Sequence, residues 1–227
     1  PLSKLDADFV RRNGLRGQPK LLRLGIRWIT KMICLAANRV IVHEQYFADL
    51  LKREYEAAPS KISVIPHGVE EPREAPEREV ARRRLGIGAE KVILFFGYIA
   101  GYKGLDILVE SLRFLGKDAD YFLIVAGGMH PRLRFDPGYV EAVRALEKRA
   151  RELSGHVVFT GFVSEESIPL YFRAADVAVF PYREAIASSG PLSLALAYKT
   201  PVLVSTPLAK SLSLEGSACC FDLDPHH

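Results

Sequence analysis

Cysteine, methionine and tryptophan are scarce in this chain, with three, two and one residues among 227. Two of the three cysteines, Cys219 and Cys220, are adjacent. This arrangement excludes the framework of paired disulfides that is typical of small secreted domains. We therefore expect a reducing compartment and a cytoplasmic protein.

The chain also has little excess charge of either sign. Its 31 Lys and Arg residues stand against 27 Asp and Glu residues, which gives a formal net charge of +4. So small an excess does not predict binding to nucleic acid, and it leaves anionic small molecules and a membrane surface open as partners. His67 and His130 are isolated along the chain, so the spacing predicts no metal site, and we expect no cofactor.

Apolar residues make up 48% of the chain, which is enough to bury a substantial core. They gather in short β-branched runs, and most of the intervals between the runs can hold a helix. The runs cover residues 39–43, 62–66, 92–97, 121–128, 157–162, 177–181 and 202–206. This alternation predicts an α/β protein with a parallel sheet that is covered by helices on both faces.

Two helices between the runs are clearly predicted. One follows residue 97, where apolar residues recur at helical spacing as Leu105, Leu108, Val109, Leu112 and Leu115. The other extends from about Pro137 to Leu153, with Asp136 as its N-cap and proline at its first position.

A stretch rich in Pro and Glu, VEEPREAPEREV at residues 69–80, leaves no room for a strand. We place a domain boundary near Gly68, so that residues 1–68 end one domain and residues 69–227 form most of a second, truncated one. The chain starts with Pro1 and ends with His226 and His227, and we expect a piece of a longer protein.

The carboxyl ends of parallel strands are where an open α/β sheet places its functional loops. In FFGYIAGYKG, Gly97 lets the backbone turn sharply after a strand, and Lys103 stands at the start of the next helix. A lysine charge beside a helix N-terminus suits a diphosphate, although a solvated surface lysine beside a structural turn is the simpler alternative.

The segment SSGPL offers a second group of this kind. Ser188, Ser189 and Gly190 precede Pro191 and Leu192, which begin a helix, so Ser189 and Gly190 compete for the N-cap position. Amides and hydroxyls there can hold a terminal phosphate without a cation. The alternative is a plain N-cap in a tight loop.

In their order and spacing, the motifs IPHGV, GYIAGYKG, GFVSEES and PYREAIASSGPL resemble those of the family-4 retaining glycosyltransferases. The resemblance covers most of the chain and is to the C-terminal half of these enzymes, which have two Rossmann-like domains (the GT-B fold). It implies transfer of a sugar, with retention, from a nucleoside-diphosphate sugar to a glycan, lipid-linked or small-molecule acceptor. It also implies that the usual catalytic histidine belongs to the N-terminal domain.

The resemblance further assigns roles to single residues. Glu184 is the acid that contacts the donor sugar, and the backbone at Phe162 and Val163 brackets the base. Two positions depart from the family pattern. Tyr98 stands where an arginine usually contacts phosphate, and Leu194 stands where a second acid usually holds the ribose. These departures leave a second interpretation open, a non-catalytic sugar-nucleotide or glycan-binding module that has kept the fold.

Near the N-terminus, the sequence predicts an amphipathic basic helix. Arg23, Arg27 and Lys31 recur every four residues, and another face carries Leu22, Ile26, Ile29 and Ile33. The helix is too charged to span a bilayer, but it could dock against anionic headgroups. The alternative is a helix that packs on its own domain and leaves its basic side in water.

Overall fold

The computed structural model describes residues 19–68, 71–88, 91–115, 119–153, 156–214 and 216–223. Residues 1–18 of the predicted first domain, together with His226 and His227, lie outside this description. The described residues form two parallel sheets, one two-stranded and one six-stranded.

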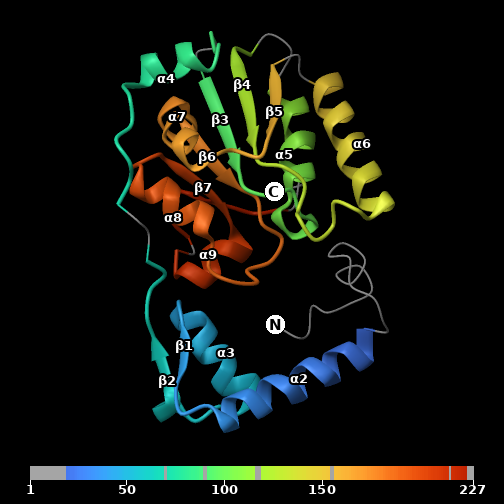
Figure 1. Ribbon diagram of the computed structural model, residues 1–227, viewed down its shortest axis with the longest axis vertical. Helices are drawn as coiled ribbons and strands as arrows, with labels where there is room; N and C mark the ends of the chain where they lie inside the picture. The colour runs from blue at the N-terminus through green and yellow to red at the C-terminus, as the bar shows by residue number, and fades with distance from the viewer. Residues whose placement is uncertain are drawn as a thin grey trace.

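The smaller sheet belongs to the N-terminal part of the chain, at the bottom of Figure 1. Strands β1 (Val40–Val42) and β2 (Ile62–Val64) pair in parallel, and α3 (Gln45–Tyr55) connects them. Helix α2 (Pro19–Ala36) precedes β1 and contacts α3. The predicted boundary at Gly68 falls in the extended segment that follows β2, along the left side of Figure 1.

The six-stranded sheet has the order β5-β4-β3-β6-β7-β8, and all its pairings are parallel. Its strands are β3 (Lys91–Phe96), β4 (Tyr121–Ala126), β5 (Val157–Gly161), β6 (Val177–Phe180), β7 (Val202–Ser205) and β8 (Cys220–Phe221). Every apolar run predicted from the sequence forms a strand of one sheet or the other. The absence of a strand from the described part of residues 69–80 was also predicted.

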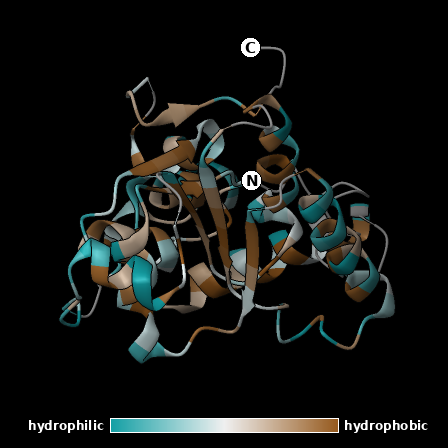
Figure 2. Ribbon diagram, turned by 90° about the horizontal axis from the view of Figure 1, so that it is seen from above, coloured by the Kyte–Doolittle hydropathy of each residue, from teal (hydrophilic) through white to brown (hydrophobic). Residues whose placement is uncertain are grey.

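Helices cover both faces of this sheet, as predicted. One face carries α4 (Arg78–Arg84), α7 (Ile168–Ala174), α8 (Gly190–Ala197) and α9 (Thr206–Leu212), and the other carries α5 (Leu105–Ser111) and α6 (Pro137–Leu153). Side chains alternate between the faces along β3, so that Leu94 packs in the first cluster and Phe95 in the second. The centre of the molecule is therefore apolar on both sides of the strands (Figure 2).

The predicted helix at 137–153 is confirmed in full, and the one after residue 97 is confirmed in part. Helix α5 ends at Ser111 and continues as a 3₁₀ turn, Leu112–Phe114. A 3₁₀ turn has three residues per turn, so the helical spacing is lost there. Leu115, which was expected on the buried face, is 47% exposed.

The amphipathic helix near the N-terminus is confirmed as α2, but its exposed side is not mainly basic. Leu21, Leu24 and Trp28 are each about two-thirds exposed, at 66%, 65% and 65%. Lys31 pairs with Glu56 of the neighbouring segment at 2.6 Å. Among the described helices, none combines the length and apolarity needed to cross a membrane.

Candidate functional site

The order of the strands reverses at the junction of β3 and β6, because β4 and β5 lie on one side of β3 and β6 to β8 on the other. The loops that leave the carboxyl ends of β3 and β6 therefore diverge to opposite faces and leave a crevice between them. A cleft of about 750 Å³ lies there, which is a typical volume for a small-ligand site. Its walls come from the loops after β3, β4 and β5, from the start of α8, and from residues 67–73.

Gly97 stands at the centre of this crevice, directly after β3. Its amide donates to the carbonyl of Ala126 at 2.9 Å, and its φ of +117° is open only to glycine. The next strand needs a glycine as well, because a Cβ on Gly127 would lie 2.1 Å from the Gly97 carbonyl oxygen. The two loops thus approach each other as backbone, and this keeps the cleft floor open.

Lys103 brings a cation to the same point. It ends a 3₁₀ turn, Gly101–Lys103, and Gly104 at φ +69° redirects the chain into α5. The lysine is 7% exposed, and burial lowers the pKa of its ammonium group to about 8. Within the described part of the chain, no carboxylate pairs with it and no hydrogen bond holds its side chain. The centroid of the Tyr182 ring lies 5.8 Å from its Nζ.

The start of α8 lies against these two residues. Pro191 is adjacent to Gly97, since a Cβ on Gly97 would lie 3.2 Å from the proline Cγ. Ser189 is the N-cap, and its Oγ accepts from the Leu192 amide at 3.3 Å. Pro191 has no amide hydrogen, so Gly190 carries the first-turn amide that makes no hydrogen bond to any described residue.

The serine hydroxyls are placed differently from the glycine. The Ser189 hydroxyl is buried and also lies 3.2 Å from the Tyr182 hydroxyl, so it is engaged inside the protein. Ser188 Oγ is buried and has no hydrogen-bond partner among the described residues. Neither serine lines the cleft, and nor do Leu192 and Glu184. Their predicted ligand contacts, and the role of Glu184 toward a donor sugar, stay predictions.

Phe162 and Val163 line the far side of the cleft, after β5. Gly161 has φ +71°, and the turn it makes leaves the Phe162 side chain 75% exposed. Phe162 is therefore not a core residue. A large aromatic side chain in water at the edge of a cleft offers a flat apolar surface to a ligand.

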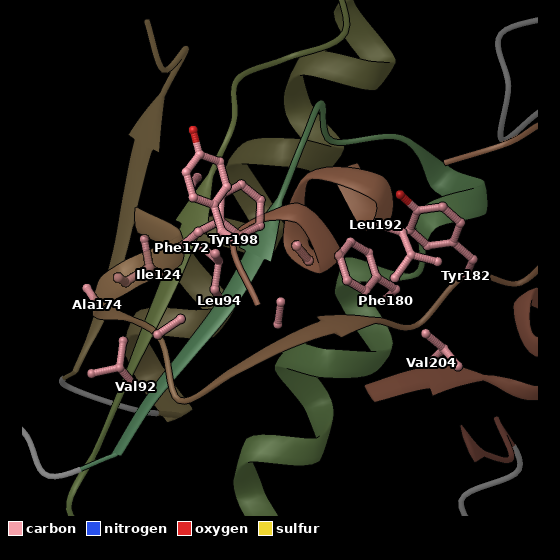
Figure 3. Close-up of a cluster of buried hydrophobic side chains, with 14 of the residues drawn as sticks. Val92, Leu94, Ile124, Phe172, Ala174, Phe180, Tyr182, Leu192, Tyr198 and Val204 are labelled. Atoms are coloured by element: carbon pink, nitrogen blue, oxygen red, sulfur yellow. The ribbon is translucent and has the colours of Figure 1, made fainter. Parts of the chain in front are cut away.

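Several cleft residues were not singled out by the sequence analysis. Arg73, from the segment between the sheets, donates to Glu165 at 3.1 Å, and its backbone amide donates to the Tyr198 hydroxyl at 3.2 Å. The Tyr198 ring in turn stacks on Phe172, with centroids 5.5 Å apart (Figure 3). These contacts join residues far apart in the sequence, and no local pattern could have indicated them.

The tyrosine that replaces the usual arginine also lines the cleft. Tyr98 is 38% exposed, and its ring meets the His130 ring edge-on with centroids 5.7 Å apart. Burial, with smaller contributions from Arg132 and Lys103, lowers the pKa of His130. Within the described residues, no group of three or more His, Cys, Asp or Glu side chains could hold a metal ion.

Most of the residues that line this cleft, Lys103 among them, lie in the part of the chain that matches a known family. The model of the Glycosyl transferases group 1 family matches residues 90–219. This chain belongs to that family. The matched part begins at β3 and ends directly before β8, and it lies in the upper part of Figure 1.

Curated relatives extend the match toward the N-terminus. D-inositol 3-phosphate glycosyltransferase of Streptomyces avermitilis is 33% identical over 186 residues, which are 77% of this chain and 38% of the relative. Mannosylfructose-phosphate synthase of Agrobacterium fabrum is 28% identical over 205 residues, 79% of this chain and 44% of the relative. This glycosyltransferase chain thus spans less than half the length of these two relatives.

Solved structures establish the fold. Sucrose-phosphate synthase from Thermosynechococcus elongatus superposes with a TM-score of 0.71 at 22% identity, over 92% of this chain and 50% of that one. HepE of Anabaena, solved in complex with UDP and glucose, gives a TM-score of 0.69 at 19% identity, over 83% of this chain and 50% of its own. The predicted GT-B type of Rossmann-like fold is confirmed.

Proposed function

We propose that the cleft of this glycosyltransferase binds the diphosphate of a nucleoside-diphosphate sugar. The buried Lys103 ammonium, which has no counter-ion among the described residues, carries the proposal. A charged amine in such a place costs free energy unless an anion offsets it, and the free Gly190 amide of the helix start points to the same kind of ligand. HepE, whose structures hold UDP or UDP-glucose, supports this donor class.

In this proposal, different residues of the cleft contact different parts of the donor. Gly97 leaves room for the diphosphate, Lys103 offsets its charge, and the amide of Gly190 donates a hydrogen bond to its end. The leaving nucleoside diphosphate gains negative charge as the glycosidic bond breaks. A fixed ammonium and a fixed amide stabilise that charge without reorganising. The base lies at Phe162 and Val163.

The finer features of the reaction rest on the family-4 resemblance of the motifs. We propose that the sugar is transferred with retention of its anomeric configuration, to a glycan, a lipid-linked acceptor or a small molecule. Glu184 would contact the donor sugar after movement of the loop between β6 and α8. The complete protein would work in the cytoplasm, where nucleotide sugars are the donors.

Calorimetry tests the donor site directly. UDP, GDP and ADP are titrated into the protein, and free glucose and mannose serve as controls; we expect one diphosphate to bind and the free sugars not to bind. Lys103→Met should weaken the binding of that diphosphate by about ten- to a hundredfold, which is the usual effect of losing a charge-assisted contact. Lys148→Met, at an exposed lysine of α6, is the matched control and should leave the dissociation constant unchanged.

Two results would contradict the proposal: binding of none of the diphosphates, or equal affinity for Lys103→Met and the unmodified protein. A third result would favour the non-catalytic module instead: the diphosphate binds, but the complete protein neither hydrolyses the corresponding nucleotide sugar nor transfers its sugar.

We also propose that α2 lies against an anionic membrane surface. The observation that favours this is the exposed apolar side of the helix, with Leu21, Leu24 and Trp28, next to the exposed cations Lys20 and Arg27. Apolar and basic side chains combined on one helix suit the interface between headgroups and acyl chains. A lipid-linked acceptor would be found at the same surface.

A further inference from the structure

Helix α8 forms one wall of the cleft, and its residues, GPLSLALA, include no charged side chain. Gly190 and Pro191 line the cleft at its start. Leu194 lines it one turn further on, and Tyr198, the C-cap of the helix, lines it one turn after that, because residues four apart in a helix share a face. Beyond its first turn the wall is therefore apolar except for the Tyr198 hydroxyl, which accepts a hydrogen bond from the Arg73 amide.

A nucleoside diphosphate has a fixed covalent order of phosphate, pentose and base. If the phosphates lie at Lys103 and Gly190, and the base lies at Phe162 and Val163, the pentose must lie between them. Leu194 is the α8 side chain next to Gly190 along that wall, about 6 Å further along the helix axis. Val163 and Ile168, which are apolar as well, line the same cleft.

The polar groups close to this wall are engaged with one another. The Arg73 guanidinium binds Glu165 at 3.1 Å, and the Arg73 amide binds the Tyr198 hydroxyl at 3.2 Å. His67 and Glu71 also line the cleft, but they belong to the segment between the two sheets rather than to α8. No carboxylate on the α8 wall is thus available to accept a hydrogen bond from a pentose hydroxyl.

We propose that Leu194 makes this cleft indifferent to the 2′-hydroxyl of the donor, so that 2′-deoxyribonucleoside diphosphates are ligands as good as their ribonucleoside counterparts. This rests on the proposed donor site and names its substrate class more closely. A carboxylate hydrogen-bonded to that hydroxyl would make the affinities for the two ligands differ by about ten- to a hundredfold, because loss of the hydroxyl would leave a desolvated charge unpaired. An isobutyl side chain provides no such penalty.

The test is a calorimetric comparison of matched pairs: UDP with 2′-deoxy-UDP, GDP with 2′-deoxy-GDP, and ADP with 2′-deoxy-ADP. Of the three pairs, the one that binds most tightly decides the outcome. Dissociation constants within about threefold of each other would support the proposal. A ribonucleotide that binds ten times more tightly or better would overturn it and would indicate that another group, such as Glu71, reads the hydroxyl. If no member of any pair binds, the donor site itself is wrong.

A reciprocal change tests the role of Leu194 itself. Leu194→Glu places a carboxylate at this position and should create a preference of about tenfold or more for the ribonucleotide, whereas Leu194→Met, which stays apolar, should keep the pair equal. Leu194→Gln, a neutral acceptor, replaces the glutamate variant if circular dichroism shows that the latter is unfolded, and a smaller preference is then expected. A folded variant with an acceptor at this position and no new preference would remove Leu194 from the pentose subsite.

Discussion

A Cβ atom on Gly97 would lie 2.7 Å from the Nζ of Lys103. The end of the central strand and the buried ammonium are therefore in direct contact, although the two residues are six positions apart in the sequence. The same Cβ would lie 3.2 Å from Pro191 at the start of α8. The loops on the two sides of the sheet crossover thus meet at Gly97. A glycine is needed there because a Cβ would collide with Lys103 and Pro191, and because the positive φ is unfavourable for any other residue.

We expect Gly97→Ala to damage both stability and binding. The methyl group would force the ammonium or Pro191 to move, and a positive φ of +117° would strain the alanine, at a cost of about 1 to 3 kcal/mol. Urea unfolding measures the first effect, and titration with the diphosphate bound by the unmodified protein measures the second. Gly190→Ala is the control for stability, because a Cβ there meets nothing within 4 Å. Gly97→Ala with unchanged stability would show that the loop has another conformation.

The burial of Lys103 gives the binding reaction a pH dependence. Its pKa of about 8 lies below the ordinary 10.5, so the unfolded chain binds more protons than the folded one between these two pH values. This residue therefore makes folding more favourable as the pH rises through that window. Diphosphate binding has the opposite dependence, because it needs the ammonium form, which the unliganded protein loses above about pH 8.

We expect the diphosphate dissociation constant to rise about tenfold between pH 7 and pH 9, and Lys103→Met to remove most of that rise. Calorimetry in two buffers of different ionisation enthalpy should also detect proton uptake near pH 8.5. A constant affinity across this range in the unmodified protein would mean that the ammonium does not contact the ligand.

The sheet and the ends of its strands could be predicted from the sequence, because burial on both faces makes each strand a short continuous apolar run. The runs at residues 92–97 and 177–181, which form β3 and β6, are examples. Gly97 indicated the position of the cleft for a related reason, since glycine readily adopts the backbone turn required there. Lys103 was predicted on its position next to a helix start.

The remaining features depend on contacts that no local pattern encodes. The pairing of Arg73 with Glu165 joins the segment between the sheets to the loop after β5, and only the folded chain brings them together. Ser189 was expected to offer its hydroxyl to a ligand or to cap the helix, and the structure places it as the cap. The reason is that Tyr182, seven residues earlier, turns back beneath it and engages the same oxygen.

Vesicle co-sedimentation tests the proposed membrane contact of α2. Vesicles that contain phosphatidylglycerol should bind the protein, and vesicles of phosphatidylcholine alone should bind it less, because Lys20 and Arg27 supply the attraction to anionic lipid. Replacing Leu24 and Trp28 together by serine should abolish binding. Phe135→Ser is the matched control, since Phe135 is an 80% exposed apolar residue outside α2. Equal binding by the α2 variant would mean that this apolar side serves another contact, such as one with protein.

The helix start at Gly190 provides the test that separates the phosphates from the rest of the nucleotide. A Cβ at Gly190 meets no protein atom within 4 Å, and the residue has no positive φ, so a valine should leave the fold intact. Gly190 nevertheless lines the cleft, and the added side chain would enter the space in which we place the distal phosphate. Gly190→Val should therefore weaken the binding of UDP by about tenfold or more. It should weaken the binding of UMP much less, because UMP lacks that phosphate and keeps its contacts at Phe162 and Val163. If another base is preferred, the matching diphosphate and monophosphate replace this pair, and circular dichroism confirms that the variant is folded. Equal weakening of both nucleotides would place the valine against the nucleoside instead, and would move the phosphates away from the start of α8.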